Sequence, residues 1–276
     1  MAKEITAVVE GIDRPSYLVD LEKAGGAKLQ DNFGAEDVVL PRIKLLQGMS
    51  TEVGNFPGAV PGVFWHTGFD QALGNSFKFV ICSRNKKYLL VAPINDGQGI
   101  LARADDARTW DREGSWEVAI DPKAKRKVTW TIEDKSVENS DVARWGSSDP
   151  ADPDSPPAAT LFYDYLVILP DHMDLGPCVL SLARSQIKRG KKGLNDKISL
   201  HASAGRPMQA IVFSANVQNE SGPAGTYFGH QFVQSGFAPE AVYKQAVKLS
   251  EVMKSYKVAD EEGDLHDKSN ADSDDF

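Results

Sequence analysis

The amino-acid sequence predicts a mainly β protein with a few helices, arranged as an antiparallel barrel or sandwich. Three observations support this fold class. Short runs rich in β-branched and aromatic residues recur along the chain, turn-forming residues separate them, and helical periodicity occurs in only one or two segments. The regular alternation of strands and helices that is typical of an α/β sheet is not seen.

Composition divides the 276 residues into three parts. Residues 1–36 are rich in glycine and charge and indicate a loosely ordered arm. Residues 37–257 have the size of one large domain, which we expect to be a single β-rich unit. Residues 258–276 indicate a disordered acidic tail. An OB-like antiparallel barrel with long insertions is one member of the predicted class, and the sequence does not separate it from other small barrels.

The first half of the domain predicts strands joined by polar turns. Alternation after Pro41 predicts a short strand, and a turn-rich stretch follows over residues 54–62. Residues 77–81 and 88–92 are rich in strand-forming residues and flank the polar segment 83–87. This pattern predicts a β-hairpin with its turn at 83–87.

The second half predicts more strands and a final helix. We expect strands at 116–120, 127–132, 160–169, 177–183, 208–217 and 226–233, an irregular loop at 146–157 and a helix near 194–204. The last helix begins near Pro239, a residue suited to a first helical turn, and its apolar residues recur at helical spacing. They are Val242, Ala246, Leu249, Met253 and Tyr256.

Composition also indicates the cellular compartment of the protein. No apolar run approaches the roughly 20 residues that a membrane-spanning helix needs. The first residues lack the apolar core of a signal peptide, so we expect a cytoplasmic protein. Cys82 and Cys178 lie far apart and form no paired motif, which argues against a disulfide framework or a thiolate metal site.

Motifs of catalysis are not found. The five histidines form no HExxH or HxH pair, and the GxSxG and phosphate-loop patterns are absent. Asp149, Asp152 and Asp154 could bind a divalent ion, although their proline-rich segment reads equally well as a surface turn. We therefore expect a protein that is not an enzyme and needs no cofactor.

Positive charge is better organised. Residues 184–197 contain six bases and one acid and follow a strongly apolar strand, so we expect them at a strand end or in a loop. Lysine and arginine side chains there can follow a phosphate backbone. The predicted phosphate contacts are Arg184, Lys188, Arg189, Lys191, Lys192 and Lys197, and the residues expected to flank the groove are Arg84, Lys86, Lys87 and Tyr88.

Aromatic residues lie near several of these basic groups. Single-strand binding combines cations for the backbone with aromatic faces on which bases stack, each worth roughly 1–3 kcal/mol. Trp130 follows the basic group at 123–127 and is a candidate for stacking. Trp110, Trp116 and Trp145 are further candidates, and each of these tryptophans could instead belong to the core.

The tail carries most of the net charge. The whole chain has 39 acids and 31 bases, a net of −8. Residues 260–276 contain eight acids and one lysine, so 31 acids and 30 bases remain without them, a net of −1. Such a segment has too little apolar surface to fold, and we expect it to compete with nucleic acid for the basic groove. Phe276 adds an aromatic side chain at the free end.

The tail resembles that of bacteriophage single-stranded DNA-binding proteins, which have an OB-fold body and an acidic tail ending in an aromatic residue. The matching residues are Asp272, Asp274, Asp275 and Phe276. The resemblance implies a protein that coats single-stranded DNA during phage replication and recombination. It also implies that these four residues dock replication or recombination proteins.

Other functions remain open. The chain could be a phage protein-interaction module that captures a host enzyme through its tail. It could also be a metal-dependent nuclease that uses the Asp149, Asp152 and Asp154 segment, or a component of the virion.

Overall fold

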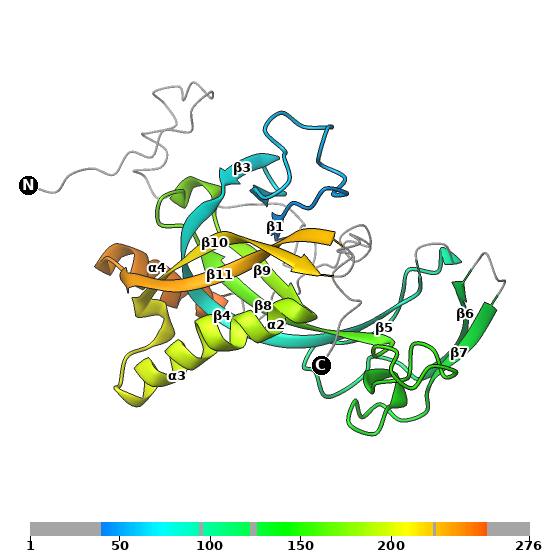
Figure 1. Ribbon diagram of the computed structural model, residues 1–276. Coiled ribbons are helices and arrows are strands. Elements are labelled where there is room, and N and C mark those ends of the chain that lie inside the picture. The colour runs from blue at the N-terminus through cyan, green and yellow to red at the C-terminus, as the bar shows by residue number, and fades with distance from the viewer. Residues whose placement is uncertain (1–39, 94–95, 122–125, 223–224, 253–276) are drawn as a thin grey trace, which may run out of the picture.

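The computed structural model describes residues 40–93, 96–121, 126–222 and 225–252 (Figure 1). The protein is mainly β, as the sequence predicts. We call residues 40–92 and 159–252 the body, which contains most of a nine-stranded sheet. Residues 93–158 form the lobe, which extends from one end of the sheet and contains a separate two-stranded sheet.

The large sheet is antiparallel except where β1 and β9 run parallel. Its order is β11 (Gly225–Phe237), β10 (Ile211–Gly222), β4 (Ser76–Val91), β8 (Ala159–Ile168), β9 (Cys178–Ala183), β1 (Arg42–Leu45), β2 (Phe64–His66) and β3 (Gln71–Gly74). A further strand, β5 (Ile100–Ala104), pairs with the far end of β4. Together these strands form a curled half-barrel (Figure 1).

A glutamine side chain covers part of the β11 edge of this half-barrel. Nε2 of Gln47 donates a hydrogen bond to the Phe228 carbonyl oxygen at 3.0 Å. The Phe228 N–H donates to Oε1 of the same side chain at 3.0 Å. Because an edge strand exposes unpaired backbone groups, the Gln47 amide substitutes here for a neighbouring strand. Gln47 lies two residues beyond β1, so it also ties the two sides of the half-barrel together.

Helices cover both faces of the body sheet. One face has an aromatic core that includes Phe64, Phe79 and Phe213. A long helical segment covers it, made of α2 (Ser185–Gly190), a π-helical turn (Lys191–Asn195) and α3 (Asp196–Ser203). On the other face, α4 (Glu240–Val252) packs with Val242 and Ala246 against β4, β8 and β9. Leu194 and Ile198 of the long helical segment are buried in the aromatic core, which anchors that segment to the sheet.

The lobe has a hydrophobic core of its own. Its strands β6 (Gly114–Asp121) and β7 (Arg126–Ile132) pair antiparallel. Trp110, Val118 and Trp130 pack together with a 3-10 turn over Asp141–Ala143. The expected strands at 116–120 and 127–132 and the irregular loop at 146–157 are therefore confirmed.

The hairpin predicted for residues 77–92 is wrong. The structure has one continuous strand, β4, and the supposed turn at 83–87 is paired with β8 from Ser83↔Leu166 to Lys87↔Phe162. The segment is polar but contains neither glycine nor proline, so nothing in it prevents an extended backbone. Pairing with a long buried neighbour outweighs the local polar pattern.

The other predicted elements are found with shifted bounds. The strands predicted at 160–169, 177–183, 208–217 and 226–233 correspond to β8, β9, β10 and β11, and the final helix is α4. The strand end or loop expected at 184–197 is instead α2 with its π-helical turn, because Ile187 and Leu194 pack on the aromatic core. The arm at 1–36 and the tail at 258–276 lie outside the described residues. Among the described helices, none is long and apolar enough to cross a membrane.

Candidate functional site

A β-bulge in β4 directs two basic side chains toward the face of the sheet that carries the aromatic core. Before the bulge, Phe79 and Ile81 point into the aromatic core. Between Ile81 and Ser83 the register with β8 shifts by one residue. Such a shift exchanges the two faces of a strand. Arg84 therefore pairs with Tyr165, and Lys86 pairs with Tyr163, on the same face as that core.

These side chains line a pocket of about 550 Å³, which we call the β4–β8 pocket. Four segments contribute to it: β4, β8, the 105–108 loop of the lobe and the π-helical turn. The Lys86 ammonium lies 5.0 Å from the centre of the Tyr163 ring, a cation–π contact. The lining residues are Arg84, Asn85, Lys86, Asp106, Ala107, Arg108, Tyr163, Tyr165 and Asn195.

Asn195 connects the pocket to the long helical segment. Nη1 of Arg84 donates to Oδ1 of Asn195 at 2.8 Å. Asn195 is the last residue of the π-helical turn, a type of helix distortion that is frequent at functional sites. Gly193 in the same turn allows close packing, because a Cβ atom there would lie 2.7 Å from Cβ of Phe232. The turn is thus fixed against β11 while it presents Asn195 to Arg84.

Tyr165 places a buried hydroxyl group at the pocket. Its residue is 1% exposed. The hydroxyl makes no hydrogen bond of ordinary geometry to any described residue, although Asn195 lies beside it. Burial raises the pKa of Tyr165 to about 12, so the hydroxyl keeps its proton at neutral pH. A buried donor without a partner is costly and calls for an explanation.

The 105–108 loop is held in place beside β4. Nδ2 of Asn85 donates to the Asp105 carbonyl oxygen at 2.7 Å. The Asp106 carboxylate accepts the backbone N–H groups of Arg108 and Thr109, both at 2.7 Å, and these bonds lower its pKa. The pocket is therefore lined by three basic side chains and one ionised carboxylate, and its net charge favours anions.

Four lysines lie exposed on the long helical segment. None of them forms an ion pair with another described residue, so their charge is available to a ligand. They are Lys188, Lys191, Lys192 and Lys197. Arg184, also predicted to bind phosphate, is exposed just before α2 and has a left-handed backbone, with φ of 52°.

Arg189 has a different role from the one predicted. It forms an ion pair with Glu220, and its Nη1 donates to the His230 carbonyl oxygen at 3.1 Å. Its side chain therefore ties α2 to β10 and β11. Arg189 differs from its lysine neighbours because it lies on another face of the helix. A prediction of a loop over this segment does not separate these faces.

Three residues that we expected at the groove are engaged elsewhere. Lys87 is 2% exposed and forms an ion pair with Asp164, on the face opposite Arg84 and Lys86. Trp130 is 5% exposed in the core of the lobe, so it offers no free face for a base. Tyr88 is half-buried beside Trp110, with ring centres 6.2 Å apart. The bulge accounts for the position of Lys87, because it places that side chain on the face of the sheet opposite the pocket.

Sequence reasoning missed Tyr163, Tyr165, Asn195 and Arg108. The two tyrosines alternate along a predicted buried strand, Thr160 to Leu169, and this alternation was a usable signal that they share a face. Asn195 and Arg108 come from segments distant in sequence, and only the fold brings them to β4.

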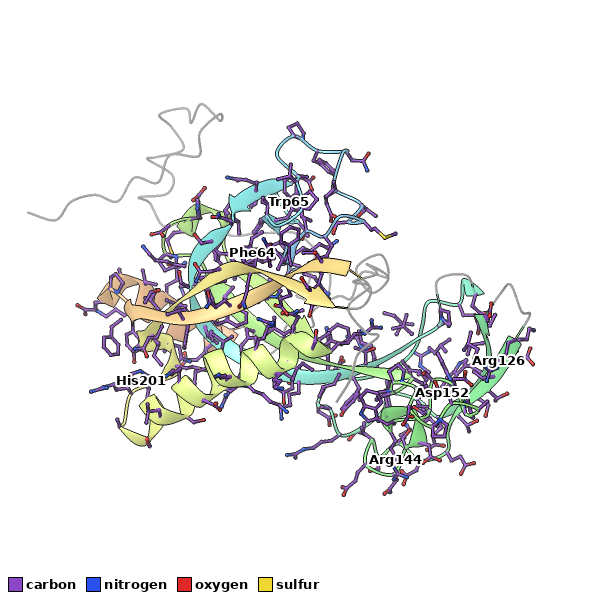
Figure 2. All side chains as sticks on the ribbon, in the orientation of Figure 1. Phe64, Trp65, Arg126, Arg144, Asp152 and His201 are labelled. Atoms are coloured by element: carbon purple, nitrogen blue, oxygen red, sulfur yellow. The ribbon has the colours of Figure 1, made fainter. Side chains whose placement is uncertain are left out.

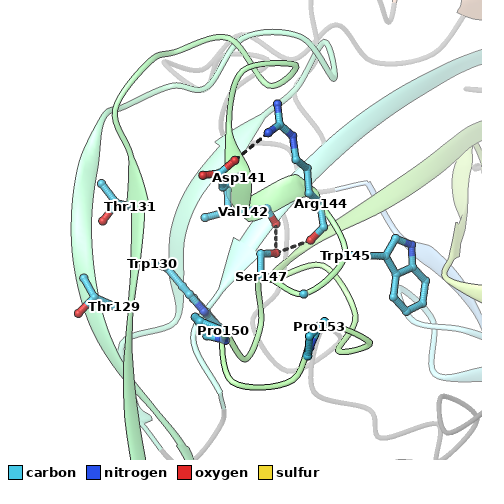
Figure 3. A pocket seen from close by; sticks show the side chains of 11 residues that line it. Thr129, Trp130, Thr131, Asp141, Val142, Arg144, Trp145, Ser147, Pro150 and Pro153 are labelled. Carbon is cyan, nitrogen blue, oxygen red and sulfur yellow. Dashed lines mark hydrogen bonds and ion pairs between the residues drawn. The ribbon is translucent and has the colours of Figure 1, made fainter.

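A second pocket, of about 440 Å³, lies on the lobe (Figure 3). Trp145, which is 62% exposed, contributes to it together with Pro150 and Pro153. The Arg144 guanidinium there is paired with Asp141 at 2.9 Å.

The two parts of the protein differ in charge. In sequence, the lobe has 14 acids and 9 bases, whereas residues 40–92 and 159–252 have 9 acids and 15 bases. The body is thus the better surface for an anionic ligand. Figure 2 shows the side chains of both parts.

The described residues contain no group of three or more histidine, cysteine, aspartate or glutamate side chains that could bind a metal ion. In the loop considered for a metal site, Asp149 instead forms an ion pair with Arg126. Asp152 accepts the Asp154 backbone N–H at 3.1 Å, an ordinary turn contact.

Some predicted site residues lie outside the described residues. They are the tail residues 272–276 and the basic residues Lys123 and Lys125.

Comparison with known proteins gives one family. The model of a family described as Pam3 phage gp34-like protein matches residues 8–259. No curated protein and no solved structure matches the chain.

Proposed function

Since the chain belongs to the Pam3 phage gp34-like family, we propose that it is a phage protein that binds single-stranded DNA and is not an enzyme. In this proposal it coats the strand during replication and recombination in the host cytoplasm. The half-barrel of the body serves as an OB-like platform. The acidic tail competes with DNA and recruits partner proteins through Phe276.

One observation carries the proposal. Lys188, Lys191, Lys192 and Lys197 are exposed on a helical segment that is anchored to the sheet, and they have no ion-pair partner among the described residues. Cations held on a rigid element can bind successive phosphates along a strand without reading its sequence. The β4–β8 pocket lies beside Asn195 of the same segment and adds further positive charge.

A salt titration of oligo(dT) binding tests this function. If about five phosphates are neutralised, affinity should fall roughly a hundredfold between 50 and 200 mM salt. Replacing the four lysines with alanine should weaken binding and lower the slope of log affinity against log salt by about 3, at roughly 0.7 for each phosphate.

The matched control removes four lysines elsewhere in the chain: Lys78, Lys135, Lys244 and Lys248. It changes the net charge equally, so a similar loss in both variants would point to a general charge effect and sink the proposed interface. A chain ending at Val258 should bind more tightly than the full chain at low salt, since the competing tail is removed.

A further inference from the structure

The β4–β8 pocket has unfilled hydrogen-bonding capacity as well as positive charge. The Tyr165 hydroxyl is buried beside Asn195 and makes no hydrogen bond of ordinary geometry to a described residue. Arg84 uses one of its five N–H groups on Asn195, so most of its donors remain available. Arg108 forms no ion pair with another described side chain. A ligand with several acceptor oxygens would satisfy these donors together.

The arrangement of the donors favours a tetrahedral anion over a planar one. Tyr165 belongs to β8, Arg84 and Lys86 to β4, and Arg108 to a loop of the lobe. Because these donors belong to three separate segments, they can contact a ligand from different sides, whereas a carboxylate presents two oxygens in one plane. The pocket volume of about 550 Å³ also exceeds what a single anion needs, and it lies within the range typical of small-molecule sites.

We propose that the β4–β8 pocket binds one phosphate group, with the Tyr165 hydroxyl as a hydrogen-bond donor and Arg84, Lys86 and Arg108 as the cations. The phosphate can come from the end of a strand, from an internal diester or from a free nucleotide. Asp106 also lines the pocket, and its Oδ1 accepts two backbone N–H groups. This site deepens the proposed function, yet phosphate binding can be tested without DNA.

Tyr165→Phe is the decisive variant, because it removes only the hydroxyl. Since that hydroxyl makes no hydrogen bond of ordinary geometry to a described residue, its loss should leave the protein at least as stable to urea. Binding of inorganic phosphate, measured by calorimetry on the full chain, should weaken by about tenfold. Arg84→Gln should weaken it at least as much. The matched control, Arg206→Gln, removes an exposed guanidinium on the body outside the pocket and should leave phosphate binding unchanged.

The source of the phosphate is resolved by comparing oligo(dT) with and without a 5′-phosphate, and dTMP with thymidine. Tighter binding of the phosphorylated oligonucleotide that is lost in Tyr165→Phe assigns the pocket to a strand end. Equal binding of both oligonucleotides, weakened alike in the variant, assigns it to an internal diester. Binding of dTMP but not thymidine, also lost in the variant, assigns it to a free nucleotide.

The proposal is overturned if Tyr165→Phe and Arg84→Gln bind phosphate and all of these probes as the unaltered chain does. It is also overturned if acetate binds as tightly as phosphate. If the phosphate proposal is overturned, the salt slope contributed by the four helix lysines is unaffected. The two proposals can therefore be refuted separately.

Discussion

Lys87 on β4 and Asp164 on β8 form an ion pair inside the protein. Nζ of Lys87 lies 2.8 Å from Oδ2 of Asp164, and the side chains are 3% and 6% exposed. Asp164 also accepts a hydrogen bond from the Ser181 hydroxyl at 2.6 Å. The pair lies just past the bulge that turns Arg84 and Lys86 to the other face, so it fixes the register on which the pocket depends.

Removing one partner of this pair should strongly destabilise the protein. Asp164→Ala removes the carboxylate that pairs with the buried Lys87 charge, at a cost of about 3–5 kcal/mol in the free energy of unfolding. Urea unfolding measures the change. The double variant Lys87→Met with Asp164→Leu should recover most of the loss, because it buries no charge. Glu240→Ala, which breaks an exposed pair with Lys244, should cost less than about 1 kcal/mol. A similar small cost for Asp164→Ala would contradict a buried pair.

The Gln47 amide should stabilise the β11 edge. Gln47→Ala leaves the Phe228 N–H and carbonyl without their partner, and we expect a loss of about 1–3 kcal/mol in urea unfolding. Amide hydrogen exchange at Phe228 should accelerate in the variant. Gln98→Ala, which removes an exposed glutamine of the lobe, is the control and should change neither quantity at Phe228. Unchanged exchange at Phe228 would show that Gln47 does not cover the edge.

His230 should make stability depend on pH. Burial, with a contribution from nearby Arg189, lowers the pKa of His230 to about 4, against 6.5 for an ordinary histidine. The unfolded chain therefore binds a proton in a pH range where the folded protein does not. The contribution of His230 to the free energy of unfolding is fully present above about pH 6.5. It falls as the pH drops toward 4, by about 3 kcal/mol in total.

Urea unfolding at several pH values between 7 and 4 measures this effect. Acidic groups also titrate in this range, so the comparison is with His230→Phe, which keeps a ring beside Phe64 and Phe232. The variant should lose less stability than the unaltered chain as pH falls. Identical pH profiles would mean that His230 keeps an ordinary pKa.

Any side chain at position 193, in the π-helical turn, should destabilise the protein. Gly193→Ala places a methyl group 2.7 Å from Cβ of Phe232 and 3.2 Å from its carbonyl oxygen. We expect a loss of about 1–3 kcal/mol from this overpacking. Gly48→Ala is the matched control, since a Cβ atom there meets nothing within 4 Å, and it should be close to neutral. Equal stability of both variants would contradict the close contact between the turn and β11.

The sequence predicts most strands because their apolar residues alternate over a buried surface. It fails at residues 83–87, where a polar stretch of β4 resembles a turn and only pairing with β8 makes it a strand. It also fails at the bulge, since one extra residue leaves no trace in composition yet decides that Lys86 lines the pocket and Lys87 is buried. The basic character of 184–197 was visible in the sequence. The separation of Arg189 from the four lysines was not, because it requires the helix and its neighbours.

The lobe enters and leaves the body at adjacent positions. β4 and β8 are paired as far as Leu90↔Ala159, so the chain enters and leaves the lobe on neighbouring strands. Topologically the two strands are a β-hairpin whose connection is the lobe. Replacing, shortening or enlarging this insert would therefore leave the path of the body chain unchanged, which makes the connection a suitable graft point for a foreign module.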